Sequence, residues 1–380
     1  METTLLESNI SLDTAPFFTV AIPNYNRRRY LEVNIQSLLE QTFEDFEILI
    51  SDDNSKDDTN EVIPSVLKAS GRQFSYYAQP VNLGYDGNVR FCLREARGRY
   101  VLMLGNDDAL VDNDTLQKVA DMLRSLDMPE VAITNYEDWE SGVVTRRAYS
   151  TCVLGSGLST ATHFFRSFSF TSGLIFSREQ AAKHETSKWD ASVYYQIFLA
   201  CRIIASGGHM AALDVSVVRD NIRLQGEIAA NTYAKRYENA PWSMKVHHTG
   251  LDSVARVTID SLLPFVHPSQ KSATIVKVFN QLLCITYPFW LFEYRRLANL
   301  GYAIGIARDF WPGKRLAEYD LRLVHRLYLW GLYGFITAIG LTVPAFLFNG
   351  IRHNLADFVR RFRQNQDLPS RQYQKSTMEP

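Results

Sequence analysis

The sequence has few cysteines, and they are scattered. Cys92, Cys152, Cys201 and Cys284 show none of the close paired spacings that mark zinc sites or disulfide frameworks. We therefore expect them to be small buried apolar residues in a reducing compartment, without a metal or redox role. The opening stretch METTLLESNI also lacks a basic region followed by an apolar one, so we expect no secretory leader and a cytoplasmic location.

The sequence also lacks a net charge. Its 40 Lys and Arg residues against 41 Asp and Glu residues leave a formal net charge of -1. This balance gives no electrostatic case for nucleic acid as a partner, so any functional charge must be local. With 380 residues, 46% of them hydrophobic, the chain can form a large core in one or two domains.

Short apolar runs alternate with helical patterns along the first part of the chain. Runs rich in β-branched and aromatic residues predict strands at 17–23, 46–51, 74–78, 100–104 and 131–135. Apolar residues at helical spacing predict helices at 28–41, 58–69, 86–96 and 114–126. This alternation predicts an α/β fold, with a mainly parallel sheet flanked by helices.

Polar residues gather where the predicted strands end. The first strand ends in IPNYNRRR, the second in SDDNSKDD, the third leads to NLGYDGN, and the fourth ends in GNDD. The carboxyl ends of parallel strands meet at one edge of a sheet, where ligands bind. Taken singly, Asp52 to Ser55 can cap the next helix, and the other stretches can be plain turns. Their recurrence at successive strand ends favours a binding site.

Acidic residues clustered at one edge repel one another unless a cation lies among them. Hard divalent ions such as Mg²⁺ or Mn²⁺ bind oxygen ligands of this kind. An ion held by few protein groups usually also binds substrate phosphates. The sequence therefore predicts a nucleotide diphosphate bridged by a divalent cation.

Two stretches of the sequence resemble a known family. VAIPNYNRRRYLEVNIQSLLEQTFEDFEILISDDNSKDDT looks like the opening of the family 2 glycosyltransferases, and NLGYDGNVRFCLREARGRYVLMLGNDDAL like their second signature. With the fainter TSGLIFSRE, the resemblance covers roughly residues 17–225. It implies the GT-A fold and an inverting transferase with a nucleotide-sugar donor.

The resemblance also implies a nucleotide-sugar site, formed by the residues at matching positions: Pro23, Tyr25, Asn26, Asp53, Asn82, Gly84, Asn88, Asn106 and Asp107. Among these, Pro23 and Tyr25 correspond to the pocket for the base, and Asp53 to the carboxylate that reads the base. The stretch from Asn82 to Asn88 corresponds to the loop that closes over the nucleotide.

The chain departs from the family pattern at one position. Asp107 matches the last residue of the DXD motif, which ligates the metal, but Gly105 stands where the family usually has the first aspartate. Asp108 can supply a second carboxylate to the metal, or a water can take that place. A shift of the alignment by one residue would instead make Asn106 and Asp108 the relevant pair.

The reaction also needs a carboxylate that takes the proton of the acceptor hydroxyl. In the family this general base starts a helix after the GLIF strand, and Asp190 fits because apolar residues recur at helical spacing directly after it. The alternative is that Asp190 is an ordinary acid in the first turn of a helix.

Two further kinds of residue are candidates near this helix. Trp189 can stack on a sugar or fill the core. Arg219 and Arg223 are candidates for the arginine that the family often has after this helix, although the later histidine is absent.

The last third of the chain has a different character. Residues 327–351 are apolar and uncharged, long enough to cross a bilayer, but Pro344 interrupts them and basic residues flank both ends. A hairpin that dips into one leaflet, or helices lying in the interface, fits these flanks better than a single span. The other interpretation is a buried helical domain. The aromatic patch at 282–296 is too short to span.

We therefore expect an N-terminal extension (1–16), a GT-A catalytic domain (17–232) and a helical, membrane-associating region (233–380). Attachment to the cytoplasmic face of a membrane favours a lipid-linked or polysaccharide acceptor, in surface polysaccharide or glycolipid assembly. The alternative is a non-catalytic relative that binds a nucleotide or a partner, consistent with Gly105. A processive synthase is disfavoured by the absence of QxxRW, and a nucleotidyltransferase by the absence of glycine in IPNYNRRR.

Overall fold

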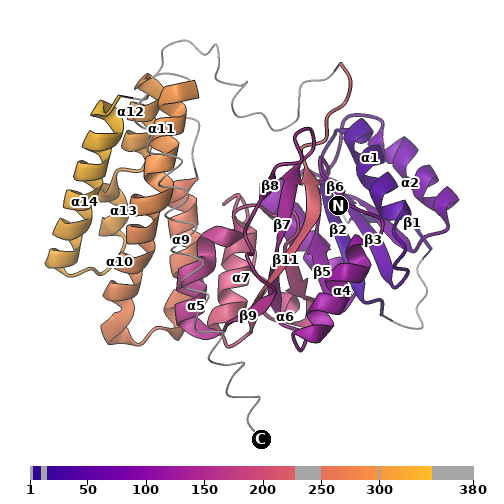
Figure 1. Ribbon diagram of the computed structural model, residues 1–380, viewed down its shortest axis with the longest axis horizontal. Coiled ribbons are helices and arrows are strands. Elements are labelled where there is room, and N and C mark those ends of the chain that lie inside the picture. Colours follow the sequence, from indigo (N-terminus) through magenta and orange to yellow (C-terminus); the bar gives the residue numbers. More distant parts are fainter. Residues whose placement is uncertain (1–2, 10–14, 227–249, 298–299, 345–380) are drawn as a thin grey trace, which may run out of the picture. The chain divides into compact units, whose positions relative to one another are not determined.

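The computed structural model describes residues 3–9, 15–226, 250–297 and 300–344. The chain divides into two compact units, residues 1–231 and residues 232–380. The described part of unit 1 combines a sheet with helices, and the described part of unit 2 is helical (Figure 1).

Within the described residues, unit 1 is built on one 11-stranded sheet. Its strands are β1 (Thr4–Ser8), β2 (Phe18–Asn24), β3 (Phe46–Asp52), β4 (Phe74–Ala78), β5 (Tyr100–Met103), β6 (Ala109–Leu110), β7 (Val131–Asp138), β8 (Val144–Thr145), β9 (Cys152–Gly155), β10 (Ile175–Ser177) and β11 (Met210–Asp220). Their order is β1-β4-β3-β2-β5-β10-β7-β11-β6, with β8 on β7 and β9 on β11. Strands β4, β3, β2 and β5 are mutually parallel, whereas β10 is antiparallel to β5 and β7. The sheet is therefore mixed.

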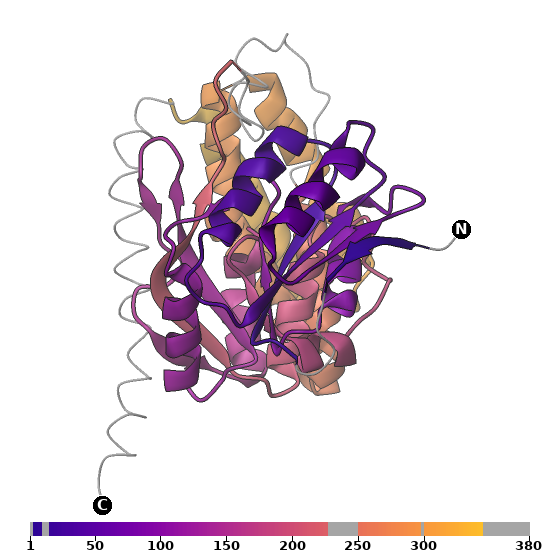
Figure 2. The same cartoon turned by 90° about the vertical axis from the view of Figure 1, so that its right-hand side faces the viewer.

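Helices cover both faces of the sheet. They are α1 (Arg28–Leu39), α2 (Thr59–Ser70), α3 (Gly84–Glu95), α4 (Thr115–Ser125), α5 (Gly157–Phe164), α6 (Arg178–Lys183) and α7 (Tyr195–Ala205), with a 3₁₀ turn at Phe165–Phe168. Helices α1, α2 and α4 share one apolar core with alternate strand residues such as Val20 and Ile48. The intervening strand residues face the opposite layer, where α3 packs against β2 and β3. Figures 1 and 2 show α1 and α2 side by side beside the first strands.

The predicted α/β fold is confirmed. The five predicted strands and four predicted helices all form, each within three residues of the expected bounds. The expected N-terminal extension contains β1, which pairs antiparallel with β4 at the sheet edge. Because β2, β3 and β5 are parallel, their carboxyl ends bring the IPNYNRRR, SDDNSKDD and GNDD stretches to the same edge.

Helices form the described part of unit 2. They are α9 (Leu251–Leu262), α10 (Lys271–Gln281), α11 (Tyr287–Leu297), α12 (Leu300–Asp309), α13 (Pro312–Ala317) and α14 (Leu323–Thr342), with 3₁₀ turns at Leu263–Phe265 and Pro268–Gln270 and a π-helical turn at Leu282–Thr286. Figure 1 shows α14 beside α10 and α11, which follow one another end to end. Tyr287 of α11 stacks on Tyr333 of α14, with ring centroids 5.6 Å apart, and its hydroxyl lies 2.8 Å from the Thr337 hydroxyl. These contacts bury one face of α14.

The other face of α14 is apolar and exposed. Leu323, Leu327 and Phe335 are 70%, 55% and 65% exposed. The helix ends at Thr342, and Val343 is extended, because the following Pro344 disfavours helical backbone at the residue before it. The apolar run 327–351 is therefore interrupted where the sequence predicted a break, and its residues from 345 onward lie outside the described residues.

One helical stretch among the described residues, Pro268–Phe292, is long and apolar enough to cross a membrane by length and composition. Its mean hydropathy is 1.4, and 44% of its apolar window is buried. This stretch includes most of the aromatic patch at 282–296, which by itself was predicted to be too short to span a membrane. The helical stretch is longer than the patch because α10, the π-helical turn and α11 follow one another without a break. A core helix of a soluble domain meets the same criterion, so this stretch alone does not establish a membrane span.

Candidate active site

The loops after β2 and β3 are joined by hydrogen bonds between buried polar side chains. Asn24 donates through Nδ2 to Oδ2 of Asp52 at 2.8 Å, and Oδ1 of Asp52 accepts from the backbone N–H of Ser55, also at 2.8 Å. The backbone N–H of Asn26 donates to Oγ of Ser55 at 2.6 Å. The helix α2 begins only at Thr59, so Asp52 and Ser55 connect two loops instead of capping that helix.

Asp53 joins the second of these loops to the start of α3. Its Oδ1 accepts a hydrogen bond from the backbone N–H of Leu83 at 2.5 Å. Asn82 donates back to the carbonyl of Asp53 at 3.1 Å, and the backbone N–H of Gly84 donates to Oδ1 of Asn82 at 3.0 Å. Burial raises the pKa of Asp53, against the lowering effect of its bonds to backbone N–H groups. The NLGYDG loop is thus positioned beside the carboxylate expected to read the base.

Two asparagines complete this network. Asn88 of α3 donates to the carbonyls of Ser51 and Asn24 at 2.9 and 3.3 Å, and its buried Oδ1 has no partner among the described residues. Asn106 donates to Oδ1 of Asn24 at 2.7 Å. The strand end that carries GNDD is therefore held against the loop after β2.

The two adjacent aspartates lie in different environments. Asp108 is buried, and its Oδ2 accepts from the Ser172 hydroxyl at 2.5 Å while Oδ1 accepts from the backbone N–H of Asn221 at 2.9 Å. Burial and the neighbouring carboxylate of Asp107 raise the pKa of Asp108 to about 8. Asp107 instead pairs with Arg27, whose Nη1 is 2.8 Å from Oδ2 of Asp107.

The structure gives a physical reason for glycine at position 105. A Cβ atom on Gly105 would lie 2.8 Å from Oδ2 of Asp108, 3.0 Å from Oγ of Ser172 and 3.2 Å from Oδ1 of Asp107. Both carboxylates therefore border the space that a side chain at position 105 would enter. The Asp108 carboxyl group would have to shift to admit a side chain there, and Ser172 is tightly placed as well.

The donors at this edge fit a divalent cation that takes most of its ligands from a substrate. No group of three or more His, Cys, Asp or Glu side chains in the described ranges is arranged to hold a metal by itself. Asp107 offers a hard carboxylate oxygen, whereas both oxygens of Asp108 accept protein hydrogen bonds. Asp220 lies close enough to Asp107 for their charges to interact, and burial and Asp138 raise its pKa to about 6. A cation here would need phosphate or water oxygens in addition.

Asp190 lies in a turn before α7, so the expectation that it starts the helix is wrong. Ala191 and Val193 have φ of 73° and 69°, and this left-handed backbone delays the helix until Tyr195. Asp86 of α3 fixes the turn: its carboxylate accepts from the backbone N–H groups of Val193 and Tyr195 at 2.5 and 3.0 Å. Helical periodicity detects the apolar face of α7 but not this extra turn.

Arg90 of α3 holds the Asp190 carboxylate. Its Nε and Nη2 donate to Oδ1 and Oδ2 of Asp190 at 3.1 and 2.8 Å, and its Nη1 donates to Glu185 at 2.9 Å. The Asp190 side chain is 28% exposed. Helix α3 thus links both halves of the candidate site, because its first turn borders Asp53 and its second turn carries Arg90.

The remaining candidates are more peripheral to these contacts. Tyr25 is 45% exposed, so its ring is available for stacking. Trp189 lies 6.5 Å from Phe198 of α7, measured between ring centroids. Arg219 donates to Glu137 at 3.0 Å and Arg223 to Glu140 at 3.4 Å, so both are engaged by acidic residues.

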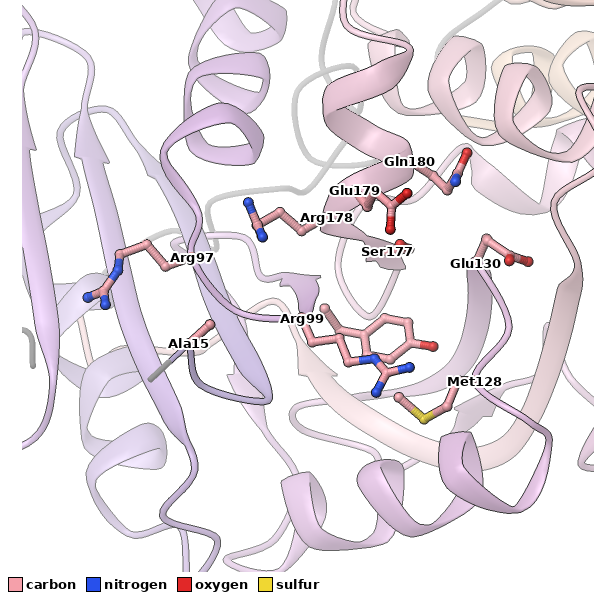
Figure 3. A pocket seen from close by; sticks show the side chains of 10 residues that line it. Ala15, Arg97, Arg99, Met128, Glu130, Ser177, Arg178, Glu179 and Gln180 are labelled. Atoms are coloured by element: carbon pink, nitrogen blue, oxygen red, sulfur yellow. The ribbon is translucent and has the colours of Figure 1, made fainter. Parts of the chain in front are cut away.

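A cavity of about 280 Å³ lies away from this edge. Figure 3 shows its lining, which includes Arg97, Arg99, Glu130 and Ser177. These residues flank the amino ends of β5 and β7 and the end of antiparallel β10. The cavity is therefore at the opposite end of the parallel strands from the polar loops, and we do not assign the nucleotide-sugar site to it.

Several partners of the candidate residues were not identified from the sequence, among them Asp86, Arg90 and Ser172. Asp86 and Arg90 belong to the signature stretch that begins NLGYDGN, and Ser172 lies in TSGLIFSRE. Because these stretches resemble the family's signatures, the sequence could have indicated that Asp86, Arg90 and Ser172 belong to the site. Their hydrogen-bond partners required the three-dimensional arrangement.

Comparisons with known proteins agree with this description. Residues 19–172 match the model of the glycosyl transferase family 2, which confirms the family resemblance for this part of the chain. The matched segment contains the loops after β2, β3 and β5 and helix α3.

Three curated relatives match parts of the same chain. The Campylobacter jejuni GalNAc(5)-diNAcBac-PP-undecaprenol beta-1,3-glucosyltransferase is 38% identical over 25% of this chain and 31% of the relative. The Escherichia coli UDP-Glc:alpha-D-GlcNAc-diphosphoundecaprenol beta-1,3-glucosyltransferase WfgD is 28% identical over 28% of this chain and 41% of the relative. The Salmonella typhimurium abequosyltransferase RfbV is 41% identical over 23% of this chain and 27% of the relative. The chain therefore matches less than half of the length of each of these relatives.

The fold has solved counterparts. Staphylococcus aureus TarS, residues 1–349, in complex with UDP aligns with a TM-score of 0.55 and 14% identity, over 85% of this chain and 90% of that chain. The same protein in complex with UDP-GlcNAc aligns with a TM-score of 0.54 and 15% identity, over the same shares of the two chains. With the mixed sheet and its flanking helices, this likeness confirms the expected GT-A fold.

Proposed function

We propose that this chain is an inverting glycosyltransferase that moves a sugar from a nucleotide-sugar donor to a hydroxyl group of an acceptor. The observation that supports this most directly is the convergence of Asp53, Asn82, Asn106 and Asp107 at one edge of the sheet, within the segment matched to family 2. The edge is the carboxyl end of parallel strands, which is where ligands bind in such sheets.

The proposed donor site uses the three connected loops. Asp53, positioned by the N–H of Leu83, would recognise the base beside Tyr25, and the loop from Asn82 to Asn88 would close over the nucleotide. Mg²⁺ or Mn²⁺, held by Asp107 with Asp108 behind it, would neutralise charge on the departing diphosphate. In this arrangement Asp108 supports the site through Ser172, in agreement with its burial.

Asp190 is the proposed general base. An inverting reaction requires one carboxylate that accepts the proton of the attacking hydroxyl while the nucleotide diphosphate leaves on the opposite side of the sugar. Arg90 keeps the Asp190 carboxylate oriented through two hydrogen bonds, and the partial exposure of Asp190 leaves it accessible to an acceptor. Each oxygen of Asp190 accepts one hydrogen bond from Arg90 and has a second lone pair that can accept a proton.

We further propose that the acceptor is lipid-linked or a polysaccharide and that unit 2 attaches to a membrane surface on its cytoplasmic face. Two of the curated relatives have names that specify undecaprenol-linked sugars. The exposed apolar face of α14, preceded by the exposed Arg322, has the composition of a helix that lies in the interface of an anionic membrane. Attachment would keep the enzyme beside an acceptor that cannot leave the bilayer.

A screen of sugar nucleotides by thermal shift, with and without Mn²⁺, tests the donor site. We expect one donor to raise the melting temperature of the wild-type protein in a metal-dependent manner, and we expect Asp107→Ala to lose that shift. Asp112→Ala serves as the control, because Asp112 is exposed and pairs with Lys118. A folded wild-type protein that no sugar nucleotide stabilises would contradict the proposal.

A further inference from the structure

Arg27 supplies a positive charge beside Asp107, the residue that would hold the divalent cation. The guanidinium Nη1 is 2.8 Å from Oδ2 of Asp107. The Asp107 side chain is only 9% exposed, whereas the Arg27 side chain is 39% exposed. The carboxylate is therefore largely enclosed, and the cation paired with it reaches solvent.

The backbone holds Arg27 in this position. Asn26 and Arg27 have φ of 56° and 65°, an uncommon succession for two residues with side chains. Asn26 anchors the turn to the loop after β3: its N–H donates to Oγ of Ser55 at 2.6 Å, and its side-chain Oδ1 accepts from the N–H of Lys56 at 2.8 Å. The turn thus fixes the backbone from which the Arg27 side chain reaches Asp107, while the exposed side chain can reorient.

A guanidinium and a divalent cation cannot both occupy Oδ2 of Asp107. Their charges repel each other, and the repulsion is only weakly screened beside an enclosed carboxylate. Oδ1 of Asp107 is turned toward Gly105, at 3.2 Å from the position of a Cβ atom. Arg27 is the more exposed partner, so it is the group that can move away.

We propose that Arg27 is a built-in counter-ion of Asp107, displaced when a divalent cation and a nucleoside diphosphate bind, and that its released guanidinium then pairs with the diphosphate. The inference rests on the proposed function. In the free protein Arg27 neutralises Asp107, and in the complex it neutralises the substrate. Arg27 would therefore weaken the binding of metal alone and strengthen the binding of nucleotide with metal.

These two effects have opposite signs, and that is what makes the inference testable. Without Arg27, Mn²⁺ alone should bind about fivefold more tightly, because an ion pair of partial exposure is worth up to about 1 kcal/mol. At saturating Mn²⁺, UDP or GDP should bind roughly tenfold more weakly, because a charge-assisted hydrogen bond to phosphate is lost. A purely structural role of Arg27 would weaken both affinities or leave both unchanged.

The first experiment is a titration of the full chain with Mn²⁺, in which electron paramagnetic resonance measures the free Mn²⁺. The second is a calorimetric titration with UDP and with GDP at saturating Mn²⁺. The variants are Arg27→Ala and Arg27→Gln. Arg28→Ala is the matched control, since Arg28 pairs with Glu32 and Asp58 and not with Asp107. Arg27→Gln preserves most of the side chain, so it gives the same comparison if the alanine variant does not fold.

Tighter Mn²⁺ binding together with weaker nucleotide binding, in the Arg27 variants and not in Arg28→Ala, is the expected result. Unchanged Mn²⁺ affinity, or no Mn²⁺ bound by either the wild type or the variants, would overturn the inference. Either of these outcomes can occur while a sugar nucleotide still stabilises the wild-type protein. Failure of the proposed function is recognised separately, because then no sugar nucleotide binds the wild-type protein or the bound donor is not turned over.

Discussion

The two units of this protein each depart from the usual distribution of residues, in opposite directions. Unit 1 buries polar side chains at one edge of its sheet, among them Asn24, Asp52, Asn88 and Asp108. Unit 2 exposes large apolar side chains along α14, among them Leu323, Leu327 and Phe335. Folded proteins normally do neither without a reason, because both arrangements cost free energy in water.

The contrast shows how different the two reasons are. At the edge of the sheet, the buried polar groups are bonded to one another across loops, so the cost of burial is offset inside the protein. Along α14, nothing in the described part of unit 2 covers the exposed face. Under the proposed function, the first region would bind a small polar ligand and the second would be covered by a membrane surface.

The largest effect is expected at Asp190. Asp190→Asn removes the proposed base but keeps the shape of the side chain, so kcat should fall by about 10² to 10⁴. Steady-state kinetics with the donor found in the thermal-shift screen measures this. Glu185→Gln is the matched control, since Glu185 bonds to the same guanidinium of Arg90 and is not assigned a catalytic role. Equal losses in the two variants would assign Asp190 to structure alone.

The exposed face of α14 is expected to give the next largest effect. Leu327→Asp combined with Phe335→Asp should weaken binding to vesicles of anionic lipid by at least about tenfold, because each buried apolar side chain is worth roughly 1.5–3 kcal/mol. Vesicle co-sedimentation of the full chain measures the change. Val143→Asp is the control, as Val143 is 64% exposed in unit 1. Unchanged binding in the double variant would show that α14 is not the attachment surface.

Restoring the usual motif should destabilise the protein. Gly105→Asp would drive its side chain into the Asp108 carboxyl and the Ser172 hydroxyl and add a third acid, so the free energy of unfolding should fall by about 2 kcal/mol without metal. Urea denaturation measures this, and Mn²⁺ should recover part of the loss. A more stable variant in the absence of metal would contradict the packing argument for glycine at this position.

A glycine in α14 is expected to behave in the opposite way. A Cβ atom on Gly331 would meet no atom within 4 Å, so Gly331→Ala should raise the free energy of unfolding by roughly 0.5–1 kcal/mol through helix propensity. The same denaturation measurement checks it. A loss of stability would contradict the open space found around Gly331.

The sequence predicted those features that depend on local pattern. Strand and helix periodicity and the polar strand ends located β2 to β5, α1 to α4 and the edge that they share. The hydrogen-bond partners of Asp108 could not be predicted from the sequence, because Ser172 and Asn221 lie 64 and 113 positions away in the chain. The turn before α7 was not predicted, because Ala191 and Val193 adopt a left-handed backbone conformation that alanine and valine rarely adopt. Packing around Gly105 likewise became apparent only in three dimensions.

The most direct test of the proposed function is the release of nucleoside diphosphate by the wild-type protein, measured in the presence of the stabilising sugar nucleotide, Mn²⁺ and an undecaprenyl-diphosphate-linked sugar. We expect turnover that requires the divalent cation and is lost in Asp190→Asn, although that variant still binds the donor. Binding of the donor without any turnover by the wild-type protein would refute the proposed transferase activity and would identify a nucleotide-binding relative that does not transfer sugar.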